Sequence, residues 1–191
     1  MGNETKRPAT YADLEALPEH VVGQIVDGEL IVMPRPASPH TMAHSVLFGD
    51  VHNAFHRGRG GPGGWWILTE PGLALGQNVL VPDLAGWRRE RMPRLARVSY
   101  HTLVPDWVCE VLSPSTASLD RGRKKELYAQ AGVGHLWLVD PDARTLEVFN
   151  RQGDTWVRRA SYSGEVHVQA EPFATFVLEL GALWPPELDA P

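Results

Sequence analysis

The sequence predicts a single α/β (α+β) domain, with a mixed β-sheet flanked by helices and extra β-hairpins. Two segments have the apolar spacing of helices, and short apolar segments bounded by proline or glycine have the pattern of strands. No repeat, low-complexity tract or linker divides the chain. We therefore expect one domain over residues 1–191, with its core at about 20–150.

The first half contains two predicted helices and four predicted strands. Residues 13–17 have the pattern of a short helix, and 24–32 that of a hairpin turning at Asp27-Gly28. A longer helix is expected over 40–56, because His44 and the apolar residues Leu47, Phe48, Val51 and Phe55 recur on one face. The glycine-rich run 58–64 ends it, and strands follow at 65–69 and 83–87.

The second half begins with a strand at 107–112, between Pro105 and Pro114. A helix is predicted over 118–131, with Asp120 or Ser118 as its N-cap. A strand at 135–139 and a hairpin of 145–149 with 155–159 come next. The segments 166–168 and 173–184 have the pattern of strands or short helices.

The composition is typical of a soluble globular protein, with 43% hydrophobic and 21% charged residues. We expect a cytoplasmic protein, because the polar start of the sequence, residues 1–6, lacks the apolar stretch of a secretory signal. No apolar run approaches the roughly 20 residues that span a bilayer, so we expect no membrane association. The single cysteine, Cys109, lies in an apolar run and is expected to be buried. A net charge of -5 argues against nonspecific coating of nucleic acid.

Two carboxylates stand out because they lie in short, apolar-rich strands. Asp83 follows Pro82, and strand alternation places Glu110 on the same face as Val108 and Leu112. A carboxylate in such surroundings needs a cation, hydrogen bonds or a raised pKa. A divalent ion bridging Asp83 and Glu110 meets that need, and hard oxygen ligands suit Mg²⁺ or Mn²⁺.

A lysine on the second long helix completes this candidate site. Lys124, Leu127, Tyr128 and Ala131 follow the i, i+3, i+4, i+7 spacing, so Lys124 is expected on the buried face. Lys125 is expected to face elsewhere. Two acids and a lysine can hold an ion, activate water and stabilise charge on a phosphodiester.

Several spaced motifs together resemble a known family. Pro82-Asp83 followed by Glu110-Val111-Leu112-Ser113-Pro114-Ser115 is similar to the PD-(D/E)xK nuclease signature. The run from Asp106 to Thr116, the spacing of Asp120, Lys124 and Tyr128, and Asp27-Gly28-Glu29-Leu30 resemble more narrowly a bacterial branch of restriction endonucleases. The likeness covers about residues 10 to 185. One departure is Leu112, which stands where the wider signature has its lysine.

The resemblance implies a restriction-endonuclease-like fold and a magnesium-dependent enzyme that cleaves DNA. It implies Asp83, Glu110 and Lys124 as catalytic residues, the lysine having moved to the helix, and Asp83, Glu110 and the Val111 carbonyl as metal ligands. Glu70, Glu29, His44 and Tyr128 are candidates for positions around this centre. The expected contacts to DNA phosphates are Arg88, Arg89, Arg91, Arg121, Arg123 and Lys125.

Other functions remain open at this point. The main alternative is a nuclease-fold module that binds nucleic acid or a protein partner without cutting; a purely structural oligomer is a third. The pairs His40/His44 and His52/His56 have the spacing of a zinc site, but no third ligand is evident. Trp184 is a candidate contact for a homodimer.

Overall fold

The computed structural model describes residues 7–186. A six-stranded sheet, in the order β11-β10-β9-β8-β6-β3, forms the centre of the molecule. Its strands are β3 (Trp65–Thr69), β6 (Leu84–Arg88), β8 (Trp107–Val111), β9 (His135–Asp140), β10 (Thr145–Gln152) and β11 (Thr155–Ser163). Only β8 and β9 pair in parallel within this sheet.

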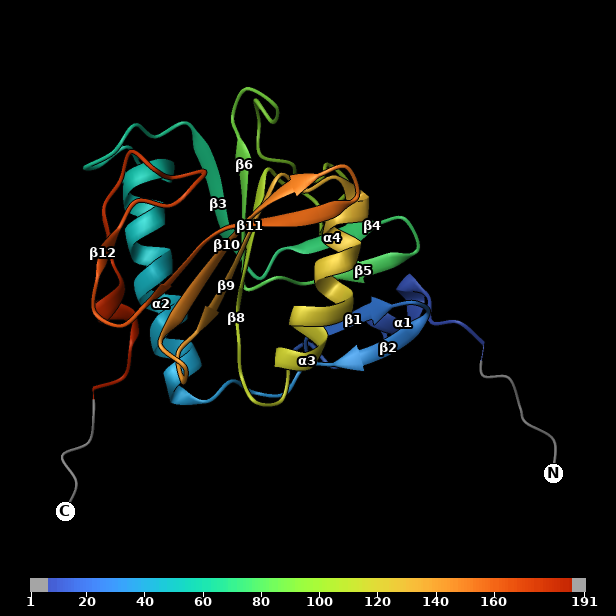
Figure 1. Cartoon of the computed structure of the whole chain (residues 1–191). Coiled ribbons are helices and arrows are strands. Elements are labelled where there is room, and N and C mark those ends of the chain that lie inside the picture. Colours follow the sequence, from blue (N-terminus) through green and yellow to red (C-terminus); the bar gives the residue numbers. More distant parts are fainter. Residues whose placement is uncertain (1–6, 187–191) are drawn as a thin grey trace, which may run out of the picture.

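A second sheet, in the order β2-β1-β5-β4-β7, lies to one side of the first (Figure 1). Its strands are β1 (Gly23–Val26), β2 (Glu29–Val32), β4 (Gly72–Leu75), β5 (Asn78–Leu80) and β7 (Tyr100–His101). A third sheet has two strands, β12 (His167–Val168) and β13 (Leu178–Glu179).

Helices cover both faces of the central sheet (Figure 1). On one face lies α2 (Ser38–Val51), which continues into the π-helical turn η1 (His52–His56). On the other lie α3 (Ala117–Leu119), the π-helical turn η2 (Asp120–Lys124) and α4 (Lys125–Ala131). The short helices α1 (Tyr11–Glu15) and η3 (Leu180–Leu183) lie near the ends of the described chain.

Strand β8 is fully buried because helices and sheet cover both of its faces. Trp107, Cys109 and Val111 belong to the cluster under α2, whereas Val108 belongs to the cluster under α4. The predicted alternation, which put Glu110 on the Val108 face, is confirmed, and Cys109 is buried as expected.

The predicted elements are largely confirmed, with three differences. Strands β4, β5 and β7 were not predicted; they have two to four residues, too few for a periodic pattern. The helix expected over 118–131 begins at Ala117, with Thr116 and not Asp120 or Ser118 as its N-cap. The core also extends past the predicted range of about 20–150, since Phe173 and Trp184 join the α2 cluster.

Trp184 is buried within its own chain, and its indole N–H donates to the Gly164 carbonyl at 2.8 Å. The expectation that this side chain contacts a second subunit is therefore wrong. Burial of a large aromatic ring with a satisfied N–H is the ordinary result when a C-terminal segment closes over a core.

Candidate active site

Two neighbouring strands bring the predicted acids together. β6 and β8 pair antiparallel with Leu84 opposite Cys109, so Asp83, just before β6, lies beside Glu110 and Val111. The backbone N–H of Val111 donates to Asp83 Oδ2 at 2.7 Å. Sheet register therefore fixes the Asp83 carboxylate next to the Glu110 strand.

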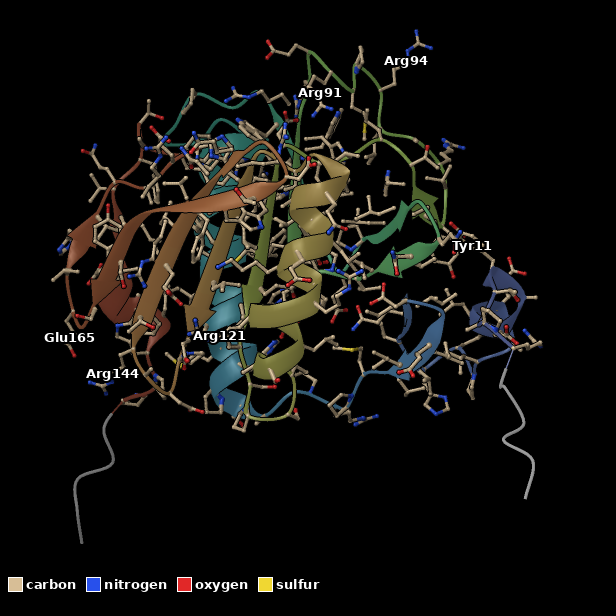
Figure 2. All side chains as sticks on the ribbon, turned by 45° about the vertical axis from the view of Figure 1, so that its right-hand side comes forward. Tyr11, Arg91, Arg94, Arg121, Arg144 and Glu165 are labelled. Atoms are coloured by element: carbon tan, nitrogen blue, oxygen red, sulfur yellow. The ribbon has the colours of Figure 1, made fainter. Side chains whose placement is uncertain are left out.

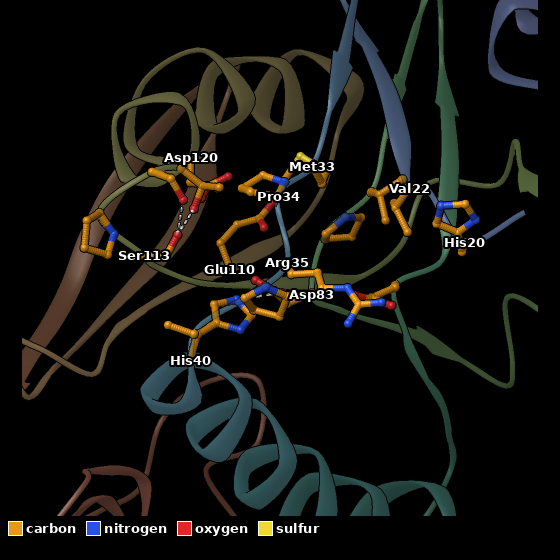
Figure 3. A pocket seen from close by; sticks show the side chains of 18 residues that line it. His20, Val22, Met33, Pro34, Arg35, His40, Asp83, Glu110, Ser113 and Asp120 are labelled. Atoms are coloured by element: carbon orange, nitrogen blue, oxygen red, sulfur yellow. Dashed lines mark hydrogen bonds and ion pairs between the residues drawn. The ribbon is translucent and has the colours of Figure 1, made fainter. Parts of the chain in front are cut away.

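Both carboxylates line one cavity of about 300 Å³ (Figure 3). The segment between β2 and α2 closes one side of it, and the loop between β8 and α3 closes another. Two further acids, Glu70 and Asp120, also line it. The remaining lining residues are His20, Val22, Met33, Pro34, Arg35, Pro36, Ala37, His40, Val81, Pro82, Ser113, Pro114, Ser115 and Thr116.

Lys124 lies behind the cavity and contacts Glu110 directly. Its Nζ is 2.7 Å from Glu110 Oε1, 2.9 Å from Asp120 Oδ1 and 3.3 Å from the Val81 carbonyl oxygen. Tyr128 donates its hydroxyl to the same Glu110 oxygen at 2.6 Å. Glu110, Asp120 and Lys124 are all at most 2% exposed, so one ammonium group serves two buried carboxylates.

This arrangement of charges and burial raises the pKa values of both Glu110 and Lys124. Burial, opposed by the Lys124 ammonium and reinforced by the Asp120 and Asp83 carboxylates, raises the pKa of Glu110 to about 8. Burial also lowers the pKa of Lys124, but the Glu110 and Asp120 carboxylates outweigh it and raise that pKa. Lys124 is consequently charged, while Glu110 holds its proton more tightly than an exposed glutamate.

Asp120 is a site residue to which the sequence analysis gave no role at the site, although it was a candidate helix cap and part of the family motif. The turn η2 is π-helical, a geometry found often at functional sites, and it carries Asp120 and Lys124 at its two ends. Asp120, Lys124 and Tyr128 are spaced four residues apart, which places all three on one helix face. That spacing was visible in the sequence and could have identified Asp120.

The start of α2 contributes a second unpredicted residue. His40 Nε2 lies 3.1 Å from Asp83 Oδ1, and His40 Nδ1 is buried without a hydrogen-bond partner. Burial lowers the pKa of His40, but the bond to Asp83 and that carboxylate's charge outweigh it and raise the pKa. His44, one turn later, bonds to the Asp83 carbonyl at 3.2 Å. The two histidines, one turn apart on α2, therefore contact the carboxylate and the backbone carbonyl of Asp83.

Of the other residues predicted to lie around the centre, some are at the cavity and one is not. Tyr128 contacts Glu110, and Glu70 lines the cavity, where its backbone N–H donates to the Asp83 carbonyl at 2.9 Å. Glu29 instead lines a separate surface cavity with Arg7 and Asp13. The structure therefore groups Tyr128, Glu70 and His44 with Asp83 and Glu110, and leaves Glu29 outside.

The six cations expected to contact DNA all have partners within the chain. Arg121 pairs with Asp140 and Glu147, and Arg123 bonds to Asp27 at 2.5 Å and 2.7 Å. Lys125 was expected to be free to contact DNA, but its Nζ lies 3.6 Å from the Phe149 ring centre. Arg91 pairs with Asp106, and the guanidinium groups of Arg88 and Arg89 cover Trp65 and Trp66.

Three of these arginines also lie at the wrong end of the sheet to reach the cavity. Asp83 precedes β6 and Arg88 ends it, a span of about 16 Å at the usual rise per residue. Figure 2 shows Arg91 and Arg94 on the loop at the top of the molecule, with Arg121 in its lower half. The arginine-rich loop and the Asp83–Glu110 cavity are separate features.

Within residues 7–186, no three histidine, cysteine, aspartate or glutamate side chains are grouped closely enough to enclose a metal ion by themselves. A metal at the cavity would accordingly need ligands beyond side chains, such as backbone oxygen and water. Across the same residues, no helix has the length and apolarity required to cross a bilayer.

Two comparisons with known proteins found a match, one to a family model and one to a solved structure. The model of the Uma2 family, described as "Putative restriction endonuclease", matches residues 8–181. The chain belongs to this family. The family resemblance predicted from its motifs is therefore confirmed.

The fold is similar to the crystal structure of "a putative nuclease belonging to DUF820 from Anabaena variabilis ATCC 29413". The TM-score is 0.75 at 22% sequence identity, covering 93% of this chain and 98% of the other. The match confirms the predicted nuclease-like α+β fold. A comparison with curated proteins found no match.

Proposed function

We propose that this family member is a metal-dependent endonuclease that hydrolyses DNA phosphodiester bonds, with Mg²⁺ or Mn²⁺ as its cofactor. The observation that carries the proposal is the pairing of Asp83 and Glu110 on one cavity, with Lys124 bonded to Glu110. The description of the family supports the nuclease class; the metal and the DNA substrate are inferred from the site.

The donor set fits a hard divalent cation. Mg²⁺ is commonly held by one or two carboxylates and keeps several water ligands, so a cavity with two facing acids needs no third side chain. Four carboxylates line the cavity and the single buried ammonium lies behind it, leaving negative charge that a cation would offset. Asp83, Glu110 and the Val111 carbonyl would hold the ion, which supplies Lewis-acid polarisation and a more acidic bound water.

Neighbouring residues orient the two carboxylates that would bind the ion. The Val111 N–H and His40 hold the two oxygens of Asp83, which fixes the direction of the carboxylate. Lys124 and Tyr128 share one oxygen of Glu110. Lys124 stabilises the ionised form of Glu110, and we assign to the same ammonium the orientation of the attacking water or the stabilisation of charge on the phosphate.

A binding module without catalysis is the competing function, and one observation favours it. All three donors of the Lys124 ammonium are matched by Glu110, Asp120 and Val81, and the side chain is 1% exposed. If this arrangement never changes, Lys124 cannot reach a phosphate. The two functions differ in one measurable respect, cleavage in the presence of a divalent ion.

The decisive experiment compares wild type, Glu110→Gln and Glu90→Gln in plasmid cleavage with Mg²⁺ and with Mn²⁺. Glu90 is exposed and lies away from the cavity, so its variant controls for loss of one acidic charge. We expect cleavage by wild type and Glu90→Gln, and none by Glu110→Gln, which should also bind Mn²⁺ at least tenfold more weakly while remaining folded. Absence of cleavage by wild type with either ion would favour the binding module.

A further inference from the structure

The cavity combines a surplus of acids with a single arginine. Glu70, Asp83, Glu110 and Asp120 all line it, and each of them repels a phosphate group when it is ionised. Among its lining residues Arg35 is the only arginine or lysine, since Lys124 lies behind Glu110. A DNA phosphate that approaches Asp83 and Glu110 therefore meets one permanently charged cation.

Arg35 differs from the other cations near the site in having no partner. Arg121, Arg123 and Lys125 are all engaged by acids or by an aromatic ring. Arg35 is exposed, and among residues 7–186 it makes no hydrogen bond or ion pair. Its five N–H donors are thus available to a ligand, and the planar guanidinium matches two phosphate oxygens at once.

The backbone around Arg35 is restricted on both sides. Pro34 and Pro36 flank it, and a residue that precedes proline is confined to extended conformations. Figure 3 shows the Arg35 side chain beside Asp83 and Glu110 at the cavity. The loop consequently presents the guanidinium with little backbone freedom to lose on binding.

We propose that Arg35 binds the DNA phosphate at the mouth of the cavity and positions the scissile bond against Asp83 and Glu110. This assignment rests on the proposed function and gives its substrate a specific contact. It also accounts for phosphate recognition without the arginine-rich loop, which lies at the opposite end of β6.

The test uses Arg35→Gln, Arg35→Lys and a matched control, Arg159→Gln. Arg159 is exposed on β11, does not line the cavity and has no partner among the described residues. Binding of a duplex DNA oligonucleotide is measured over a range of salt concentrations without metal, and cleavage is measured with Mn²⁺. Mn²⁺ affinity is measured separately by calorimetry.

We expect Arg35→Gln to weaken DNA binding and to lower kcat/KM at least about tenfold, as for loss of one charge-assisted hydrogen bond. The salt slope of binding should fall by about one unit. Mn²⁺ should bind as tightly or more tightly, because a cation next to its ligands is gone; a merely structural role would weaken metal binding as well. Arg35→Lys should fall between wild type and Arg35→Gln.

Different results would reject the role of Arg35 and the proposed nuclease function. If wild type cleaves DNA and Arg35→Gln matches Arg159→Gln in binding and cleavage, Arg35 has no such role although the enzyme stands. If wild type never cleaves but Arg35→Gln alone weakens DNA binding, the contact stands and the nuclease does not. If wild type neither binds nor cleaves DNA, both are wrong.

Discussion

Glu110 and Lys124 illustrate how single residues with unfavourable burial can be stabilised together. A buried carboxylate and a buried ammonium each lose hydration worth several kcal/mol, and only their short contact and added hydrogen bonds offset it. Here Lys124 also serves Asp120, so its removal leaves two buried carboxylates without their cation. The neighbouring Lys125 lies over Phe149 and has no contact with Glu110.

This difference predicts contrasting effects of the same substitution at adjacent positions. Lys124→Met should destabilise the metal-free protein by about 3–5 kcal/mol, because it breaks a buried ion pair. It should also abolish cleavage, while Mn²⁺ affinity is retained. Lys125→Met should cleave DNA and lose about 1 kcal/mol from the cation–π contact. Urea unfolding and plasmid cleavage measure both effects, and equal behaviour of the two variants would contradict the separate role of Lys124.

Local sequence patterns predicted which residues form much of the site, but not the contacts among them. Alternation and helical spacing predicted the placement of Glu110 and Lys124, because both rules depend only on local geometry. The bond from His40 to Asp83 depends on how α2 docks onto the sheet, a long-range property that no local pattern encodes. The pairing of Arg121 with Glu147 on β10 was unpredictable for the same reason.

Among the elements, the β1–β2 hairpin shows how far turn chemistry predicts structure. Asp27 and Gly28 both adopt positive φ, at 51° and 81°, as a two-residue hairpin turn requires. Asp27 also bonds to Arg123, which links this hairpin to η2 next to the site. The turn was predictable from Asp-Gly alone, whereas the link to η2 was not.

A pair of glycine substitutions tests the turn. Gly28→Ala should destabilise the protein by about 1 kcal/mol or more, because φ at this position is 81° and a Cβ would lie 3.2 Å from Pro8 Cβ. Gly49→Ala, in α2 with open space around its Cβ, should instead stabilise by about 0.4–1 kcal/mol. Urea unfolding measures both changes, and destabilisation of similar size at the two positions would show that the turn conformation is not the cause.

The buried acids link the stability of the folded protein to pH. The pKa of Glu110 is about 8 in the folded state against its ordinary value of 4.5, so between these limits the folded state holds more protons than the unfolded state. Stability from this group is therefore complete below pH 4.5 and is lost as pH rises toward 8. A divalent ion that replaces the proton should act in the opposite direction, since it needs the ionised carboxylate.

The pH dependence of stability should therefore differ between wild type and Glu110→Gln. Without divalent ions, wild type should lose stability relative to Glu110→Gln as pH rises from about 5 to 8, with a limiting slope of about 1.4 kcal/mol per pH unit for one proton. Comparing the two proteins cancels the contribution of His40, whose raised pKa acts in an overlapping window. Added Mn²⁺ should stabilise wild type increasingly over the same range and leave Glu110→Gln nearly unchanged. Thermal unfolding at several pH values, with chelator or with Mn²⁺, measures all four curves. Parallel curves for the two proteins in chelator would mean that Glu110 is ionised throughout, and the Lys124 ammonium would then suffice to hold its charge.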